Sequence, residues 1–333
     1  MLNHRRYWWV NQNQTFKQEQ EGGYLWSPKH SKGGRRNPSY DFMREVSPGD
    51  IIFCFYKQHI PAIGIAQSHA YEAPKPQEFG NRGAYWESIG WRIDVRYIKL
   101  SHLIQPSHHM DRLIKHLPKK YFPLQANGHG MQSIYLAFLN TEFAAILIDL
   151  IGRQAHDIVN ALSQYDPANP LSGAEPAVWD EWEDYQVDQV QADTAIPDTD
   201  RQSIITARRG QGLFRQRVMQ IERHCRVTGV DREEHLRASH IKPWRSADNS
   251  ERLSGENGLL LTPSIDHLFD RGFISFEDDG RLLISPVAHH ESLYKMGIPR
   301  EPHDVGRFEP GQKQFLEHHR NNIYLASSYL DNL

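Results

Sequence analysis

The hydrophobic residues of the first 140 positions come in short runs separated by turn residues. Residues 91–98 alternate between apolar and polar side chains, which is typical of a half-buried strand. The runs that predict strands cover residues 7–12, 51–56, 60–66, 91–98 and 134–139. Because few helical patterns lie between them, we predict a small, strongly curved β-sheet or barrel over residues 1–140.

From residue 141 the hydrophobic spacing becomes helical. Apolar side chains recur every three or four residues from Phe143 to Leu162, which predicts an amphipathic helix with Thr141 as its N-cap and a break near Gly152. Residues 166–200 then carry ten acidic side chains and no Lys or Arg. We therefore predict a helical and acidic linker over residues 141–204. It is either a solvated connection or a mask over a basic surface of the following domain.

The remaining residues, 205–333, mix short helical and strand patterns, so the chain as a whole belongs to the α+β class. A strand that runs into a turn is predicted at residues 225–229, and a second strand at 236–244. Helical spacing marks residues 213–221 before these strands, and residues 313–320 near the end of the chain.

Composition narrows the class of protein. The two cysteines, Cys54 and Cys225, exclude a disulfide framework and a four-cysteine zinc site, and they fit a reducing cytoplasm. No apolar run reaches the length of a membrane span, and residues 1–10 do not resemble a secretion signal. The net charge of −3 hides a basic segment, because residues 201–245 hold eleven Lys or Arg against four acidic residues. Such arginines suit contacts with nucleic-acid phosphates.

The candidate catalytic residues are His240, Asn257 and His267. They lie, in this order, at the end of an apolar strand, in a loop and on a short helical segment. The surrounding sequences are Ala-Ser-His-Ile-Lys-Pro-Trp, Asn-Gly-Leu-Leu-Leu and His-Leu-Phe-Asp-Arg-Gly. Over roughly residues 205–290 they resemble the ββα-metal finger of HNH endonucleases.

The resemblance implies a role for each of these residues. His240 is the general base that takes a proton from the attacking water. Asn257 pins the loop and orients His240, and His267 ligates a divalent metal ion. The residues implied as phosphate clamps are Arg237, Lys242 and Arg271.

The sequence departs from the family pattern at Ser239, where many HNH sites have an aspartate as the second metal ligand. Asp270 is the first candidate to replace it, because it follows His267 by three residues on nearly the same helical face, and Asp266 is the second. Oxygen and imidazole ligands suit Mg²⁺ or Mn²⁺. The cysteine pairs that bind zinc in many HNH proteins are missing, so no structural zinc is expected.

Four segments of the N-terminal region resemble the EVE domain, a member of the PUA-like group. They are Trp-Trp-Val-Asn at 8–11, Gly-Tyr-Leu-Trp-Ser-Pro at 23–28, Pro-Gly-Asp-Ile-Ile-Phe at 48–53, and residues 85–97. Residues 86–97 are also similar to YTH domains, which read methylated adenine in RNA. The resemblance covers most of residues 1–140 and predicts an EVE reader fused to an HNH nuclease.

An EVE-like domain implies a pocket for a flipped, modified base. By position, the aromatic and apolar lining comes from Trp26, Pro28, Trp86 and Tyr135. The candidates for hydrogen bonds to the base edge are Asn11, Asn13 and Gln132. Stacking on such aromatic rings contributes about 1–3 kcal/mol per base, and a methyl group on the base adds apolar surface that the pocket can bury.

The expected function is that of a modification-dependent DNA endonuclease of the restriction type. Its partner is double-stranded DNA with 5-methyl- or 5-hydroxymethylcytosine, and cutting both strands suggests a homodimer. The alternatives are a modified-DNA reader with an inactive nuclease, an RNA nuclease guided by methylated adenine, and a non-specific nuclease. Ser239 keeps the first alternative open, and the YTH-like segment keeps the second open.

Overall fold

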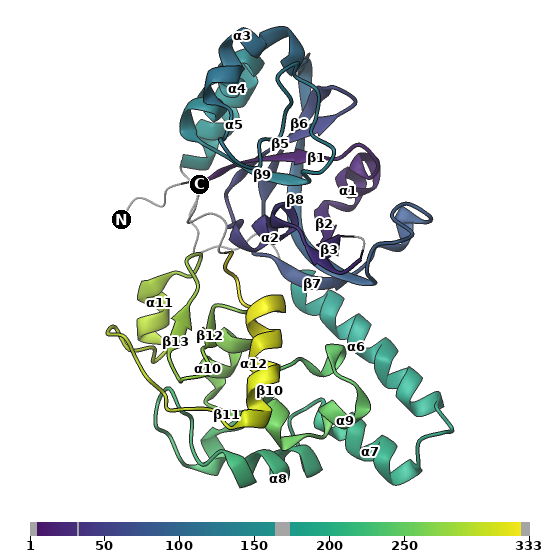
Figure 1. The fold of residues 1–333 in the computed structure, drawn as a ribbon, viewed down its shortest axis with the longest axis vertical. Coiled ribbons are helices and arrows are strands. Elements are labelled where there is room, and N and C mark those ends of the chain that lie inside the picture. Colours follow the sequence, from purple (N-terminus) through teal and green to yellow (C-terminus); the bar gives the residue numbers. More distant parts are fainter. Residues whose placement is uncertain (1–4, 32, 164–173, 328–333) are drawn as a thin grey trace. The chain divides into compact units, whose positions relative to one another are not determined.

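The computed structural model describes residues 5–31, 33–163 and 174–327 (Figure 1). The chain divides into two compact units, one of residues 1–176 with 327–333 and one of residues 177–326. Each unit mixes strands and helices, which confirms the predicted α+β class. No helix in the described ranges is both long enough and apolar enough to cross a membrane.

The first unit is built around a curled sheet of seven strands in the order β2-β8-β6-β5-β1-β9, with β7 also paired to β8. Its strands are β1 (Tyr7–Asn11), β2 (Tyr24–Pro28), β5 (Ile51–Tyr56), β6 (His59–Ala66), β7 (Tyr71–Pro74), β8 (Ile89–Ile104) and β9 (Leu136–Leu139), and a separate pair is β3 (His30–Ser31) with β4 (Arg35–Arg36). Its helices are α1 (Phe16–Gly22), α2 (Pro38–Asp41), α3 (Met110–Leu113), α4 (Thr141–Ile151) and α5 (Arg153–Ser163).

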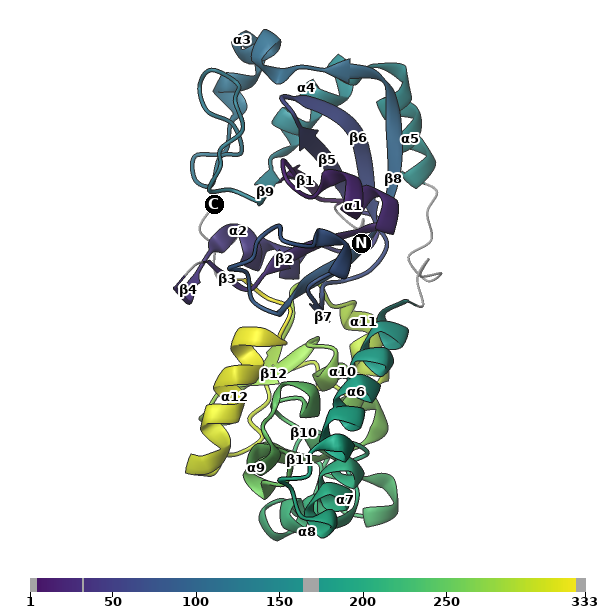
Figure 2. The same cartoon turned by 90° about the vertical axis from the view of Figure 1, so that its right-hand side faces the viewer.

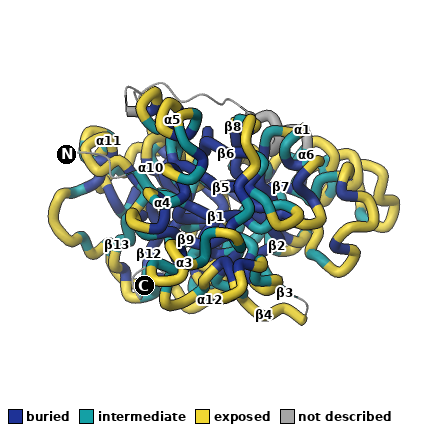
Figure 3. The backbone as a smooth tube through the Cα atoms, turned by 90° about the horizontal axis from the view of Figure 1, so that it is seen from above, coloured by how far each residue is buried: buried dark blue, intermediate teal, exposed yellow. Residues whose placement is uncertain are grey.

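The curl of the sheet depends on the long strand β8. Its first half pairs with β2 and β7, and its second half pairs with β6, so this one strand joins β2 and β7 to the rest of the curled sheet (Figure 2). The strands β1, β5 and β6 form the buried centre of the unit (Figure 3). The strands predicted from the hydrophobic pattern at residues 7–12, 51–56 and 60–66 are therefore confirmed.

Helices α4 and α5 complete the core of the first unit, although the sequence pattern assigned their residues to a linker. Phe143, Leu147 and Leu162 are buried in the same cluster as the sheet residues. The predicted break falls at Gly152, whose φ of +84° favours glycine. The predicted N-cap was wrong by one residue, because the side chain of Asn140, not Thr141, accepts the hydrogen bond from the Phe143 amide.

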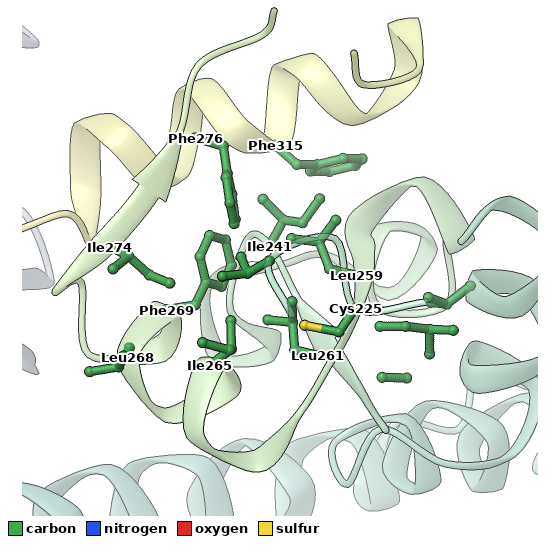
Figure 4. Close-up of a cluster of buried hydrophobic side chains, with 14 of the residues drawn as sticks. Cys225, Ile241, Leu259, Leu261, Ile265, Leu268, Phe269, Ile274, Phe276 and Phe315 are labelled. Carbon is green, nitrogen blue, oxygen red and sulfur yellow. The ribbon is translucent and has the colours of Figure 1, made fainter. Parts of the chain in front are cut away.

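The second unit packs short strands and helices around one apolar cluster. Its helices are α6 (Ala174–Ala192, which starts in the first unit), α7 (Asp198–Ala207), α8 (Gly212–Ile221), α9 (Asn249–Arg252), α10 (Pro263–Asp270), α11 (His290–Lys295) and α12 (Pro310–Asn322). Its strands are β10 (Arg237–His240), β11 (Gly258–Leu261), β12 (Ile274–Phe276) and β13 (Leu282–Ile284). Figure 4 shows Ile241, Leu259, Ile265 and Phe269 converging in this cluster.

Two sequence-based interpretations of this region were wrong. Residues 225–229 form a turn closed by the Gly229 amide on the Cys225 carbonyl oxygen, so they do not include a strand. The second is the solvated connection proposed for the acidic segment: its described residues lie largely in α6 and α7, as a helical linker would, but Val190 is buried in the core of the second unit. The predicted helix near residue 313 is confirmed as α12, whose Phe315 and Leu316 are buried.

Candidate functional site

His240 is the last residue of β10, and its ring is held between two elements of the second unit. The ring stacks on that of Phe214 in α8, with 3.7 Å between the centroids and 3° between the planes. Its Nε2 lies 3.0 Å from the carbonyl oxygen of Arg252, at the end of α9. These two contacts fix both the plane and the rotation of the imidazole.

The contact with Arg252 also determines which nitrogen of His240 carries the proton. A carbonyl oxygen can only accept a hydrogen bond, so Nε2 must be the donor. In the neutral ring Nδ1 then keeps its lone pair. Within the described part of the chain Nδ1 has no hydrogen-bond partner, and it is not among the atoms that are both buried and unpaired, so it reaches solvent. A water molecule can therefore approach a free proton acceptor.

The surroundings of His240 favour the neutral ring. The pKa of His240 is lowered to about 4, chiefly by burial and also by the positive charge of Arg252, although the hydrogen bond to the Arg252 carbonyl acts in the opposite direction. The imidazole is therefore unprotonated at neutral pH, as a general base must be.

His319 shows the same packing in a purely structural form. Its ring stacks on Phe269 at 3.8 Å and 3°, and Nε2 lies 3.0 Å from the Phe269 carbonyl oxygen. Its Nδ1, however, lies 2.9 Å from the hydroxyl oxygen of Ser275, so both nitrogens are occupied. The free Nδ1 is what distinguishes His240 from this histidine.

Asn257 holds the segment that follows His240. Its Oδ1 accepts a hydrogen bond from the Lys242 amide at 2.7 Å, and its Nδ2 donates to the carbonyl oxygens of Lys242 at 3.1 Å and Glu251 at 3.2 Å. The side chain is fully buried. One carboxamide thus joins the two ends of the stretch that separates His240 from Arg252.

Two carboxylate groups of α10 form hydrogen bonds with side chains of β10. Arg237 donates to Asp266 at 3.2 Å, and the Ser239 hydroxyl donates to Asp270 at 3.3 Å. Two residues along a strand and four along a helix cover similar distances, so the two pairs match in register. Asp270 therefore lies against the position where many HNH sites have their aspartate.

The predicted metal ligands Asp270 and His267 both lie on α10. Asp270 is exposed, yet the protein atoms around its carboxyl group and the negative charge of Asp266 raise its pKa. A cation would relieve this repulsion. His267 is exposed on the same helix. Among the described residues no three His, Cys, Asp or Glu side chains gather as a metal site. Mg²⁺ commonly takes few protein ligands and completes its shell with water and phosphate oxygens.

The three predicted phosphate clamps differ in their surroundings. The Arg237 side chain keeps 63% of its surface exposed despite its ion pair with Asp266. Lys242 is paired with Glu251 at 2.5 Å, and only 19% of its side chain is exposed. Arg271 is half-buried at the end of α10. Arg237 is therefore the most accessible of the three cations.

In the first unit, Trp26 and Trp86 are brought together. Their ring centroids are 6.1 Å apart with an interplanar angle of 36°, and Phe79 lies 5.9 Å from Trp26. Trp26 is fully buried, whereas Trp86 is half-buried. Gly90 supports the close packing, because a Cβ there would lie 2.4 Å from the Trp26 ring. Since the two indoles are in direct contact, a base could stack on Trp26 only after Trp86 moves aside.

Tyr135 meets Trp26 at a buried carboxyl group that sequence reasoning missed. The Tyr135 hydroxyl donates to Oε1 of Glu19 at 2.8 Å, and the Trp26 amide donates to the same atom at 3.1 Å. Gln12 donates to Oε2 of Glu19 at 2.5 Å and to the Tyr97 hydroxyl at 3.0 Å. The Oε1 of Gln12 is buried without a partner. No sequence signal marks this network, because helix α1 is polar and its burial depends on the closure of the sheet.

The other predicted pocket residues lie in different settings. Asn11 donates to the carbonyl oxygens of Pro123 and Ile134 and accepts from the Trp9 indole, so its side chain holds the neighbouring loop. Pro28 is buried at the end of β2, two residues after Trp26. Gln132 is exposed, as is Asn13. The structure therefore joins Trp26 and Tyr135 at Glu19, places Trp86 against the Trp26 ring, and gives Asn11 a structural role.

Glu19 should make the stability of the protein depend on pH. Burial raises its pKa from 4.5 to about 7, although four hydrogen-bond donors act in the opposite direction. Because the folded pKa lies above the unfolded one, this contribution is fully present below about pH 4.5 and is lost as the pH rises through about 7. Relative to Glu19→Gln, the wild type should lose about 2–3 kcal/mol of unfolding free energy between pH 5 and 8. Urea denaturation at both pH values checks this, and an equal difference at both would contradict it.

Strands β10 and β11 and helix α10 form a ββα arrangement, with a free imidazole nitrogen at the end of the first strand. Residues 225–277 match the family model of the HNH endonucleases (HNH_2), so this segment is an HNH endonuclease domain. The match confirms the resemblance seen in the sequence. No curated protein matches the chain.

Solved structures with a similar fold each cover less than half of this chain. A hypothetical protein from Leishmania major is 10% identical with a TM-score of 0.34, and the match covers 46% of this chain and 99% of that one. Human THYN1, in complex with DNA containing 5-methylcytosine, is 14% identical with a TM-score of 0.30 and coverage of 44% and 98%. The YTH domain of the Zygosaccharomyces rouxii MRB1 protein, in complex with N6-methyladenosine RNA, is 13% identical with a TM-score of 0.29 and coverage of 45% and 88%. The N-terminal half resembles these domains.

Proposed function

We propose that this protein is an EVE–HNH fusion that cuts DNA when it finds a modified cytosine, as a type IV-like restriction endonuclease does. The single observation that carries the nuclease part is the geometry of His240, whose Nε2 is bound to the Arg252 carbonyl oxygen while Nδ1 is free. The reader part is supported by the aromatic group of Trp26 and Trp86 next to the buried polar network of Glu19.

In the proposed reaction Nδ1 of His240 accepts a proton from the water that attacks the phosphorus atom. The low pKa makes the ring a weak base in the free protein, and the negative charge of bound phosphates raises this pKa. Asn257 keeps the loop between His240 and Arg252 in place. A Mg²⁺ or Mn²⁺ ion bound by His267 and Asp270 would stabilise the charge on the phosphate and on the leaving 3′ oxygen. Arg237 is positioned to contact a neighbouring phosphate.

In the proposed reader, a cytosine is flipped out of the duplex and enters between Trp26 and Trp86 once Trp86 has moved aside, so that the base stacks on both rings. A 5-methyl or 5-hydroxymethyl group adds contact area against the aromatic rings. The buried Oε1 of Gln12 is an acceptor without a partner, and the exocyclic amino group of cytosine is a donor. This pairing favours cytosine over thymine, whose oxygen at the same position is an acceptor.

Replacing Asp270 with asparagine should raise the metal concentration needed for half-maximal cleavage by about tenfold or more, because it removes one of two charged or imidazole ligands. The measurement is a titration of cleavage rate against Mn²⁺ and Mg²⁺. Asp231→Asn is the matched control, since Asp231 is exposed and distant in sequence from α10. An unchanged metal dependence would remove Asp270 from the proposed site and make Asp266 the next residue to test.

Base reading is tested by measuring DNA affinity with a variant that is expected not to cleave. His240→Ala protein is titrated with duplexes that carry one cytosine, 5-methylcytosine or 5-hydroxymethylcytosine at the same position. We expect at least one modified duplex to bind about tenfold or more tightly, and a 2-aminopurine placed next to the modified base to brighten as that base leaves the stack. Equal affinities for the three duplexes, with no change in fluorescence, would contradict the reader role.

A further inference from the structure

We infer that Gln186 of helix α6 is a positioning residue for the general base, because it holds the residue whose carbonyl group binds His240. The inference rests on the proposed role of His240. It is carried by a chain of hydrogen bonds from the side chain of Gln186 through Arg252 to Nε2 of His240.

The side chain of Arg252 is buried and forms its contacts within the protein. Its Nε donates to the Trp244 carbonyl oxygen at 2.9 Å, and its Nη1 donates to Oδ1 of Asn249 at 3.0 Å. The guanidinium carbon lies 3.8 Å from the centre of the Trp244 ring. The residue as a whole keeps only 7% of its surface exposed. These contacts fix the end of α9, and with it the carbonyl oxygen that accepts the hydrogen bond from His240.

Gln186 bridges the two ends of this segment with one carboxamide group. Its Oε1 accepts from Nη2 of Arg252 at 2.8 Å, and its Nε2 donates to the Arg245 carbonyl oxygen at 2.8 Å. The carboxamide supplies both the donor and the acceptor that this bridge needs. Residue 245 precedes α9 and residue 252 ends it, so Gln186 ties these two points together, as Asn257 does for residues 242 and 251.

Acidic residues of α6 next to Gln186 also form ion pairs with arginines of the second unit. Glu183 pairs with Arg208 at 2.8 Å and lies 3.7 Å from Arg245, and Asp184 pairs with Arg208 at 2.6 Å. One turn after Gln186, Val190 is buried in the core of the second unit. The chain passes from the first unit to the second inside α6, at residues 176 and 177. Helix α6, whose Gln186 binds Arg245 and Arg252, is thus also the helix in which the chain enters the second unit.

The test uses the full-length chain with Gln186→Ala and the control Gln189→Ala, which removes an exposed glutamine from the same helix. For Gln186→Ala we expect kcat for cleavage of modified DNA to fall about tenfold or more, because a small displacement of a reacting group has large effects on rate. KM, the affinity for DNA and the melting temperature should stay within the range of the control. Imidazole ¹⁵N resonances, with His240 assigned by comparison with His240→Ala, should show the Nε2–H tautomer in the wild type and a mixture in Gln186→Ala.

A Gln186→Ala protein with wild-type kcat and a single His240 tautomer would overturn the inference. A loss of rate shared equally by Gln189→Ala, with a lowered melting temperature in both, would also overturn it, because the effect would then belong to the stability of α6. The tautomer comparison needs no cleavage. If the wild type cuts no DNA, the proposed function fails, while the tautomers still decide whether Gln186 positions His240.

Discussion

Replacement of His240 with alanine is expected to lower the rate of DNA cleavage by about 10²–10⁴-fold, which is the usual contribution of a general base. The reason is that Nδ1 is the proton acceptor that the fold leaves free, whereas Nε2 is bound to the Arg252 carbonyl oxygen. Binding of modified DNA should be unchanged, because base reading is assigned to the first unit. Single-turnover cleavage and a binding titration on the same preparation measure both properties.

Two controls separate this chemical role from damage to the fold. His235→Ala removes an exposed histidine from the same unit and should cut at the wild-type rate. Free imidazole added to His240→Ala should restore part of the lost activity, because the alanine leaves space beside the Phe214 ring. Cleavage by His240→Ala at the wild-type rate would mean that the base is elsewhere.

Replacement of Trp86 with alanine should lower the affinity for modified DNA by about 10- to 100-fold and should leave the affinity for unmodified DNA unchanged. This expected loss of affinity corresponds to the stacking free energy of one base on an aromatic ring, which is about 1–3 kcal/mol. Trp86 is the informative tryptophan because it is half-buried. Trp26, in contrast, is fully packed against Phe79, and its loss would destabilise the first unit. Fluorescence anisotropy with the His240→Ala background measures both affinities.

The control for this substitution is Tyr185→Ala, which removes an exposed aromatic residue from the second unit. It should bind modified and unmodified DNA as the parent does. Equal losses for the two kinds of DNA in Trp86→Ala would assign this tryptophan to general DNA contact, and the base pocket would then have to lie elsewhere.

The nuclease site could be predicted from the sequence because its parts are local. His240, Asn257 and His267 lie within 28 residues, and their order on strand, loop and helix follows the chain directly. The role of Asp270 rested on helical spacing, and the hydrogen bond from Ser239 adds a spatial reason for it. Most of the curled sheet was accessible in the same way, because short apolar runs mark its strands, although β2 and β7 were not predicted.

The parts that could not be predicted depend on contacts between distant residues. Glu19 belongs to a polar helix, and nothing in its neighbourhood indicates that Tyr135 and the Trp26 amide will bury it. The acidic segment suggested a solvated linker because the partners of Glu183 and Gln186 are Arg208 and Arg252, 25 and 66 residues later in the chain. The sequence shows how many acidic residues a segment has, but whether they are solvated or form ion pairs depends on the residues that the fold places next to them.

The central claim is that cleavage depends on base modification, and the most direct measurement is digestion of one plasmid in four forms with Mg²⁺ or Mn²⁺. The forms are unmodified DNA and DNA with 5-methylcytosine, 5-hydroxymethylcytosine or N6-methyladenine. We predict cleavage of one or both forms with modified cytosine, and little or none of the unmodified and N6-methyladenine forms. Equal cleavage of all four forms would contradict the account and indicate a non-specific nuclease. Cleavage of none, with tight binding of a modified form, would indicate a reader with an inactive nuclease.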